Sequence, residues 1–191
     1  LIAAGEKGVD INSHVEDDWG PSSSIRSMSP LGIGPVLKDR TAVNVGLVAC
    51  MSYLDDKGFG PSLVHRNGVT RARMFQEITI AQQTDCSDDA ALAAALDQLE
   101  ATLNSPLGNM KGDYCVGQYT LADCAWAGVC QVATNMGKGT AVSSRSAVNT
   151  WFAAVQSHPS TSKEAINPFS CLSTKADHDG NTMRDVRINT A

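Results

Sequence analysis

The stretch that most constrains the fold covers residues 114–130 and reads YCVGQYTLADCAWAGVC. Thr120 and Asp123 have the spacing of a capping box, in which a hydroxyl and a carboxylate each accept a hydrogen bond from a backbone amide at the start of a helix. Tyr119 and Cys124 have the spacing of a hydrophobic staple around the same turn. The residues that follow are almost all apolar, so we expect a helix that is buried on most of its faces. We interpret the capping box as a structural feature that starts this helix, and not as a site.

Composition indicates a globular chain and excludes some function classes. The chain has 191 residues, of which 42% are hydrophobic and 18% are charged, which is enough for one compact domain or two small ones. Its net charge of −5 argues against nucleic acid as a partner, because phosphates must be neutralised by cations. No apolar run approaches the roughly 20 residues of a membrane-spanning helix, so we expect a soluble protein.

The cysteines and histidines favour neither a disulfide framework nor a metal site. No two cysteines form a C-x-x-C pair, so we expect small buried thiols in a reducing compartment, either the cytosol or an organelle interior. The histidines are scattered, and we expect no metal. The cysteines are Cys50, Cys86, Cys115, Cys124, Cys130 and Cys171, and the histidines are His14, His65, His158 and His178.

The first 58 residues predict a small α/β unit. Asp39 and Arg40 would form a two-residue turn between hairpin strands, and Asn44 could cap the helix that follows. The expected elements are a helix end over 1–8, a strand within 10–17, a loop or short helical turn over 20–30, strands over 34–39 and 41–44, and a helix over 45–58.

The rest of the chain predicts helices. The turn-rich segment GFGPS indicates a linker. In the helix expected over 87–104, Ser87 would be the cap, and leucines recur at helical spacing. Further helices are expected over 70–83 and 146–159, and the polar tail from about residue 170 should be an extended arm.

Several segments together resemble glutathione transferases. The segment GDYCVGQYTLADCAWAGV resembles the start of the central buried helix in the helical domain of that family. SPLGIGPVLKD resembles the segment before a strand in its thioredoxin-like half, CMSYLDDKG the end of its third helix, and AVNTWFAAVQSHPS a late helix. LIAAGEKGVDINSHVED resembles the end of the first helix and the second strand. The resemblance covers residues 1 to about 165 in the family's order.

The resemblance implies a fold with two parts. The expected fold is an α/β thioredoxin-like half, whose first strand is missing from this chain, followed by an all-α helical domain. The expected domains are a thioredoxin-like domain over 1–58, a linker over 59–66, an all-helical domain over 67–169 and a polar C-terminal tail over 170–191.

The resemblance also implies where glutathione would bind. Pro35 would be the family's cis-proline, and the backbone of Gly34 would pair with the cysteinyl part of glutathione. The family's Glu-Ser or Gln-Ser pair, which holds the γ-glutamyl carboxylate at the start of the third helix, is replaced by Gly46 and Leu47. Losing two such hydrogen bonds could weaken glutathione binding by a factor of about several hundred. Asn44 lies close and could substitute in part.

No catalytic residue can be identified. The family's catalytic tyrosine, serine or cysteine lies on or just after the first strand, and we expect it upstream of Leu1. Cys50 occupies an apolar helix position without a basic neighbour, so we expect it in the core.

Three functions are compatible with these observations. The first is a noncatalytic docking or structural subunit of a larger assembly, a pseudoenzyme with a degenerate glutathione site. The second is an active glutathione-dependent transferase or reductase acting on small electrophiles, and the third is a carrier of an apolar ligand. The expected partners are other protein subunits or a second copy of the chain, with glutathione as the one small molecule that the resemblance suggests.

Overall fold

The computed structural model describes residues 2–12, 24–30, 32–104, 113–158 and 188–189. It divides the chain into two compact units, with the boundary between Gly60 and Pro61. The first contains most of the elements before this boundary, and the second contains the helices that follow it. Each unit is described separately below.

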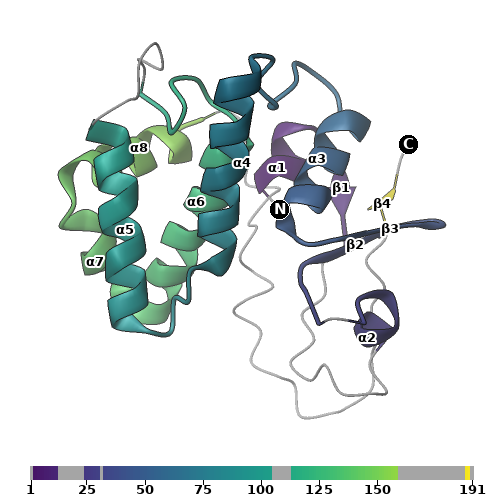
Figure 1. The fold of residues 1–191 in the computed structure, drawn as a ribbon, viewed down its shortest axis with the longest axis horizontal. Helices are drawn as coiled ribbons and strands as arrows, with labels where there is room; N and C mark the ends of the chain where they lie inside the picture. Colours follow the sequence, from purple (N-terminus) through teal and green to yellow (C-terminus); the bar gives the residue numbers. More distant parts are fainter. Residues whose placement is uncertain (1, 13–23, 31, 105–112, 159–187, 190–191) are drawn as a thin grey trace. The chain divides into compact units, whose positions relative to one another are not determined.

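The first unit contains short helices and two pairs of antiparallel strands (Figure 1). β2 pairs with β3, with Leu37 opposite Asn44 and Asp39 opposite Ala42. β1 pairs with the C-terminal strand β4, so this part of the tail is a strand of the unit. The elements are α1 (Ile2–Glu6), β1 (Asp10–Ile11), α2 (Ser24–Met28), β2 (Val36–Asp39), β3 (Ala42–Val45), α3 (Leu47–Lys57) and β4 (Ile188–Asn189).

One prediction for the hairpin of this unit is wrong. The turn between the hairpin strands consists of Arg40 and Thr41, and Asp39 still belongs to β2. Asp39 is buried and its carboxylate binds a side chain of α3, which keeps it in the strand. Of the strand expected over 10–17, the first two residues form β1. Positions 13–17 lie outside the described residues, as does most of the tail.

The hydrophobic core of the first unit lies where α1 and α3 meet the β2–β3 hairpin. Ala4, Leu37, Cys50 and Leu54 form this core, and Val9, Ile11 and Tyr53 pack against it. Beside it, Lys7 and Asp55 form an ion pair of 3.2 Å between Nζ and Oδ1, and both side chains are 2% exposed. A buried pair of this kind links the end of α1 to the end of α3.

The second unit is built around α6, the helix expected from the capping box (Figure 1). α6 packs against α4, α7 and α8, and α5 packs against α8. Ten of the thirteen residues of α6 are buried, as the apolar run predicts. The elements are α4 (Gly68–Gln83), α5 (Asp89–Asn104), α6 (Leu121–Ala133), the π-helix η1 (Thr134–Lys138), α7 (Gly139–Ser143) and α8 (Ser146–Gln156).

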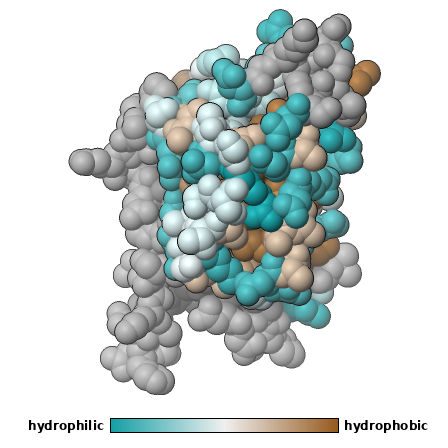
Figure 2. All heavy atoms as spheres, turned by 90° about the vertical axis from the view of Figure 1, so that its left-hand side faces the viewer, coloured by the Kyte–Doolittle hydropathy of each residue, from teal (hydrophilic) through white to brown (hydrophobic). Residues whose placement is uncertain are grey.

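The surface of the helices is mainly polar on the face drawn in Figure 2. Hydrophilic residues cover most of this face, and apolar residues form only small areas among its described residues. The leucine face of α5 points inward instead, since Leu92, Leu96 and Leu99 are buried. Among the described residues, no helix is long and apolar enough to cross a membrane.

Two predicted helix caps are wrong. Asp88, and not Ser87, caps α5, because its Oδ1 accepts hydrogen bonds from the amides of Ala90 and Ala91 at 2.8 and 3.2 Å. Gly46, and not Asn44, is the N-cap of α3, because Asn44 is still paired within β3.

Candidate functional site

The turn before β2 has the conformation that the resemblance implied. The Gly34–Pro35 peptide bond is cis. The loop that leads into it is held by Ser29, whose Oγ donates to the carbonyl of Ile33 at 2.8 Å and accepts from the amide of Ile33 at 3.0 Å. The carbonyl of Pro35 accepts a hydrogen bond of 2.8 Å from the amide of Gly46, which joins the turn to the start of α3. Contact of Gly34 with glutathione remains a prediction.

The start of α3 lies beside this turn and consists of the two residues singled out in the sequence. Gly46 is the N-cap with φ 86° and ψ 155°, and Leu47 is the first helical residue. No side chain of the described residues caps this helix. Neither residue has a side-chain hydrogen-bonding group, so these two residues could bind a carboxylate only through their backbone amides.

Asn44 stands on β3 opposite Leu37, so its side chain lies on the same face of the hairpin as the buried Leu37. Its Nδ2 is buried and has no hydrogen-bond partner among the described residues. Asn44 lies opposite Leu37, which comes two residues after Pro35. That its side chain binds the carboxylate in place of the missing pair stays a prediction.

Cys50 lies under the turn and belongs to the core, as predicted. Its Sγ is 3.5 Å from the carbonyl oxygen of Pro35 and 3.4 Å from that of Asn44. Burial raises the pKa of the Cys50 thiol to about 11. The thiol is therefore protonated at neutral pH, so its single S–H can donate to either carbonyl, and it is a poor nucleophile.

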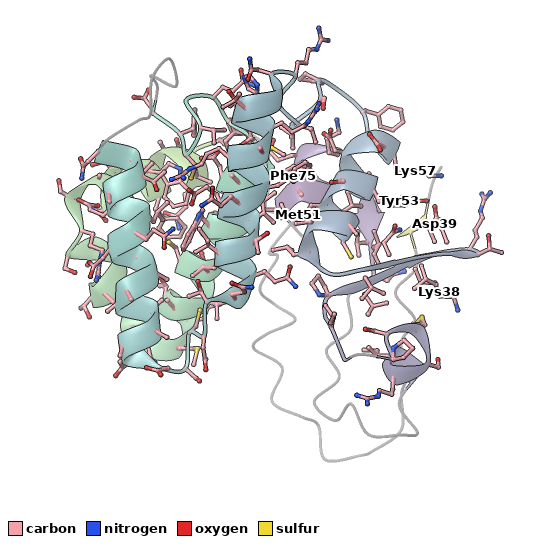
Figure 3. The ribbon with its side chains drawn as sticks, in the orientation of Figure 1. Lys38, Asp39, Met51, Tyr53, Lys57 and Phe75 are labelled. Atoms are coloured by element: carbon pink, nitrogen blue, oxygen red, sulfur yellow. The ribbon has the colours of Figure 1, made fainter. Side chains whose placement is uncertain are left out.

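A cluster on α3 and β2 was missed in the sequence (Figure 3). Tyr53 donates a hydrogen bond of 2.5 Å from Oη to Oδ2 of Asp39, and Nζ of Lys57 lies 3.4 Å from the same oxygen. The hydrogen bond from Tyr53 lowers the pKa of Asp39, and the same bond raises the pKa of Tyr53. The only sign of this cluster within one segment of the sequence is that Tyr53 and Lys57 are one helical turn apart on α3. Asp39 belongs to another element, β2, so local spacing cannot reveal it.

The capping box of α6 is present and lies within a larger buried network. Asp123 accepts hydrogen bonds from the amides of Cys115 and Thr120 at 3.0 and 2.9 Å. It also accepts from Thr120 Oγ1 at 3.2 Å and from Trp151 Nε1 at 2.9 Å. Burial raises the pKa of Asp123, and these hydrogen bonds oppose that change. Nearby, Tyr119 Oη and Cys124 Sγ are 3.5 Å apart, so the two residues of the predicted staple are in contact.

A second buried carboxylate supports the same helix. Glu77 of α4 accepts a hydrogen bond of 3.1 Å from Trp126 Nε1 and forms an ion pair of 3.1 Å with Arg73. Burial raises the pKa of Glu77. Among the described residues, no group of three or more histidine, cysteine or acidic side chains could hold a metal ion. Through Trp126 and Trp151, these buried carboxylates join α4 and α8 to α6.

Comparison with known proteins identifies the fold. No protein-family model and no curated protein matches the chain. Among solved structures, a maleylacetoacetate isomerase from Methylobacterium extorquens with bound malonate and glutathione matches with a TM-score of 0.67 and 18% identity, over 84% of this chain and 86% of the other. A maleyl pyruvate isomerase described as a zeta-class glutathione transferase matches with a TM-score of 0.63 and 18% identity, over 84% and 87%. A possible glutathione transferase from Rhodopseudomonas palustris matches with a TM-score of 0.63 and 23% identity, over 83% and 86%.

The chain therefore has the glutathione transferase fold, with a thioredoxin-like unit and a helical unit. The resemblance found in the sequence is confirmed at the level of the fold. The Gly34–Pro35 bond is cis and Gly46 is the N-cap of α3, and the correspondence of these positions to a glutathione site stays a prediction.

Proposed function

We propose that this protein is a glutathione transferase-like docking subunit whose glutathione site is degenerate and which does not catalyse a reaction. The observation that carries the proposal is the start of α3, where Gly46 and Leu47 replace the two side chains expected to hold the γ-glutamyl carboxylate. Hydrogen bonds to a charged group contribute about 1.5–3 kcal/mol each. Losing two of them would weaken binding by a factor of about several hundred or more.

The backbone at Gly46 adds to this argument. Its φ of 86° lies in the left-handed region, where a residue with a Cβ is strained by about 1–2 kcal/mol. Glycine adopts this conformation freely. A larger side chain at this position would therefore cost folding stability.

The second candidate is an active glutathione-dependent enzyme. The cis turn at Gly34–Pro35 favours it, because this backbone is what the resemblance assigns to the cysteinyl part of glutathione. Two of the solved structures with this fold are named isomerases, and one of them contains bound glutathione.

Isothermal titration calorimetry with glutathione separates the two candidates. We expect no binding by the unchanged protein at glutathione concentrations up to about 1 mM, which corresponds to a binding free energy weaker than about −4 kcal/mol. Binding at that concentration or below would refute the degenerate site and support the enzyme.

Leu47→Ser tests the assignment of this site. The new hydroxyl would lie at the first helical position, where it could bind a carboxylate and raise glutathione affinity by about tenfold or more. Leu47→Ala is the matched control, because it removes the same apolar side chain without adding a hydroxyl. Equal affinities of the two variants would show that Leu47 does not stand at the carboxylate position.

A further inference from the structure

The turn of the β2–β3 hairpin contains an arginine in an unfavourable backbone conformation. Arg40 has φ 53°, and it is the one residue other than glycine with a positive φ among the described residues. Hairpins with two-residue turns favour glycine, asparagine or aspartate where φ is positive. Long side chains are rare in this conformation, and such positions gather at binding and catalytic sites. The unfavourable backbone conformation of Arg40 indicates that its exposed side chain has a function.

The outer edge of β3 carries backbone groups that the hairpin does not use. A two-residue turn makes the flanking pair Asp39–Ala42 a hydrogen-bonded pair, so the next pair, Lys38–Val43, is not hydrogen-bonded across the hairpin. The amide and carbonyl of Val43 therefore point away from β2. Among the described residues, no strand pairs with this edge of β3. Val43 itself is 42% exposed.

Positive charge surrounds the same end of the hairpin. Lys38 and Arg40 are exposed, and the side chain of Lys57 is 45% exposed. The carboxylate of Asp39 is almost buried and already binds Tyr53 and Lys57. Figure 3 shows Asp39, Tyr53 and Lys57 on the face of the hairpin that meets α3, and Lys38 on the opposite face. Because Lys57 is paired with Asp39, Lys38 and Arg40 are the cations that this end of the hairpin presents to a partner.

We propose that the outer edge of β3 and the turn at Arg40 form a docking surface for an extended, acidic segment of a partner protein. The segment would add to β3 as a further strand, and its carboxylates would lie against Arg40 and Lys38. Strand addition of this kind takes its affinity from backbone hydrogen bonds and its specificity from side chains. The inference rests on the proposed docking function, for which it names the surface and the class of partner.

Fluorescence anisotropy with a labelled peptide tests the proposal. The probe is a peptide of alternating glutamate and valine, about six residues long, which is the length of an ordinary strand. We expect the unchanged protein to bind it in the micromolar range and to bind it more weakly as salt is added. Arg40→Gly should weaken binding by about tenfold. The melting temperature of Arg40→Gly should not fall, because glycine adopts a positive φ freely.

Arg71→Ala is the matched control, since it removes an exposed arginine from α4 in the other unit. It should leave peptide binding unchanged. Hydrogen exchange of the complex locates the peptide, and the amide of Val43 should become protected. Equal binding by Arg40→Gly and the unchanged protein, or protection confined to other elements, would overturn the proposal. Equal binding of a lysine–valine peptide or of a thymidine oligonucleotide would also overturn it.

These results are independent of the glutathione titration. A protein that binds both glutathione and the acidic peptide would refute the degenerate site and leave the docking surface standing. A protein that binds neither would refute the docking surface and leave the degenerate site standing.

Discussion

Replacement of Asp123 by alanine should strongly destabilise the helical unit. The carboxylate is wholly buried and accepts hydrogen bonds from the amides of Cys115 and Thr120 and from the indole of Trp151. Asp123→Ala would leave these three donors buried without an acceptor, and each such group costs about 1–3 kcal/mol. The variant also no longer buries a carboxylate, which offsets part of this cost. We therefore expect a loss of about 3–4 kcal/mol in the free energy of unfolding.

Urea unfolding followed by tryptophan fluorescence measures this loss. Trp126 and Trp151 are buried in the helical unit, so their emission reports its unfolding. Asp97→Ala is the control, because the Asp97 side chain is 70% exposed and is paired with Arg145 on the surface. Removing an exposed ion pair should cost less than about 1 kcal/mol. If Asp123→Ala cost no more than Asp97→Ala, the view of Asp123 as the centre of a buried network would be refuted.

Two further predictions concern Cys50 and Glu100. The pKa of the Cys50 thiol is about 9 in the unfolded chain and about 11 in the folded protein. Between these pH values the folded state therefore holds a proton that the unfolded state has lost. The free energy of unfolding should fall as pH rises from 9 to 11. Urea unfolding at both pH values should show a smaller fall for Cys50→Ala, and an equal fall would contradict the burial of this thiol. Glu100 accepts hydrogen bonds from the amides of Ala147 and Val148, at the start of α8, at 3.0 and 2.8 Å. Glu100→Ala should therefore lower the free energy of unfolding by about 1–2 kcal/mol, which thermal unfolding measures. Gln98→Ala, an exposed change on the same helix, is its control, and similar losses would argue against this role of Glu100.

Much of the helical unit could be predicted from local patterns. The capping box at Thr120 and the apolar run after it predicted α6 and its burial, because both signals lie within one short segment. The cap of α5 was misplaced by one position, since Ser87 and Asp88 are both good capping residues. Only the packed structure distinguishes them, because Asp88 is the one whose carboxylate reaches the amides of the first turn.

The buried polar contacts could not be predicted in the same way. Trp151 binds a carboxylate 28 positions earlier in the chain, and Trp126 binds one 49 positions earlier. The ion pair of Lys7 with Asp55 likewise joins two helices that are distant in sequence. Such pairs depend on how helices pack, and neither spacing nor periodicity in one segment carries that information. The hairpin turn was misplaced for a related reason, since the partner of Asp39 is Tyr53 on α3.

The candidate site could be located from the sequence only through the resemblance, and the structure shows which contacts within the protein hold it together. The carbonyl of Pro35 accepts a hydrogen bond from the amide of Gly46 and lies within 3.5 Å of the Cys50 thiol. The same thiol reaches the carbonyl of Asn44. These contacts join the cis turn, β3 and α3 through groups of the protein itself. Replacing the side chains that would bind a carboxylate at the start of α3 leaves all of these contacts in place. Loss of glutathione affinity is therefore compatible with a stable thioredoxin-like unit, which is the condition that a docking subunit with this fold has to meet.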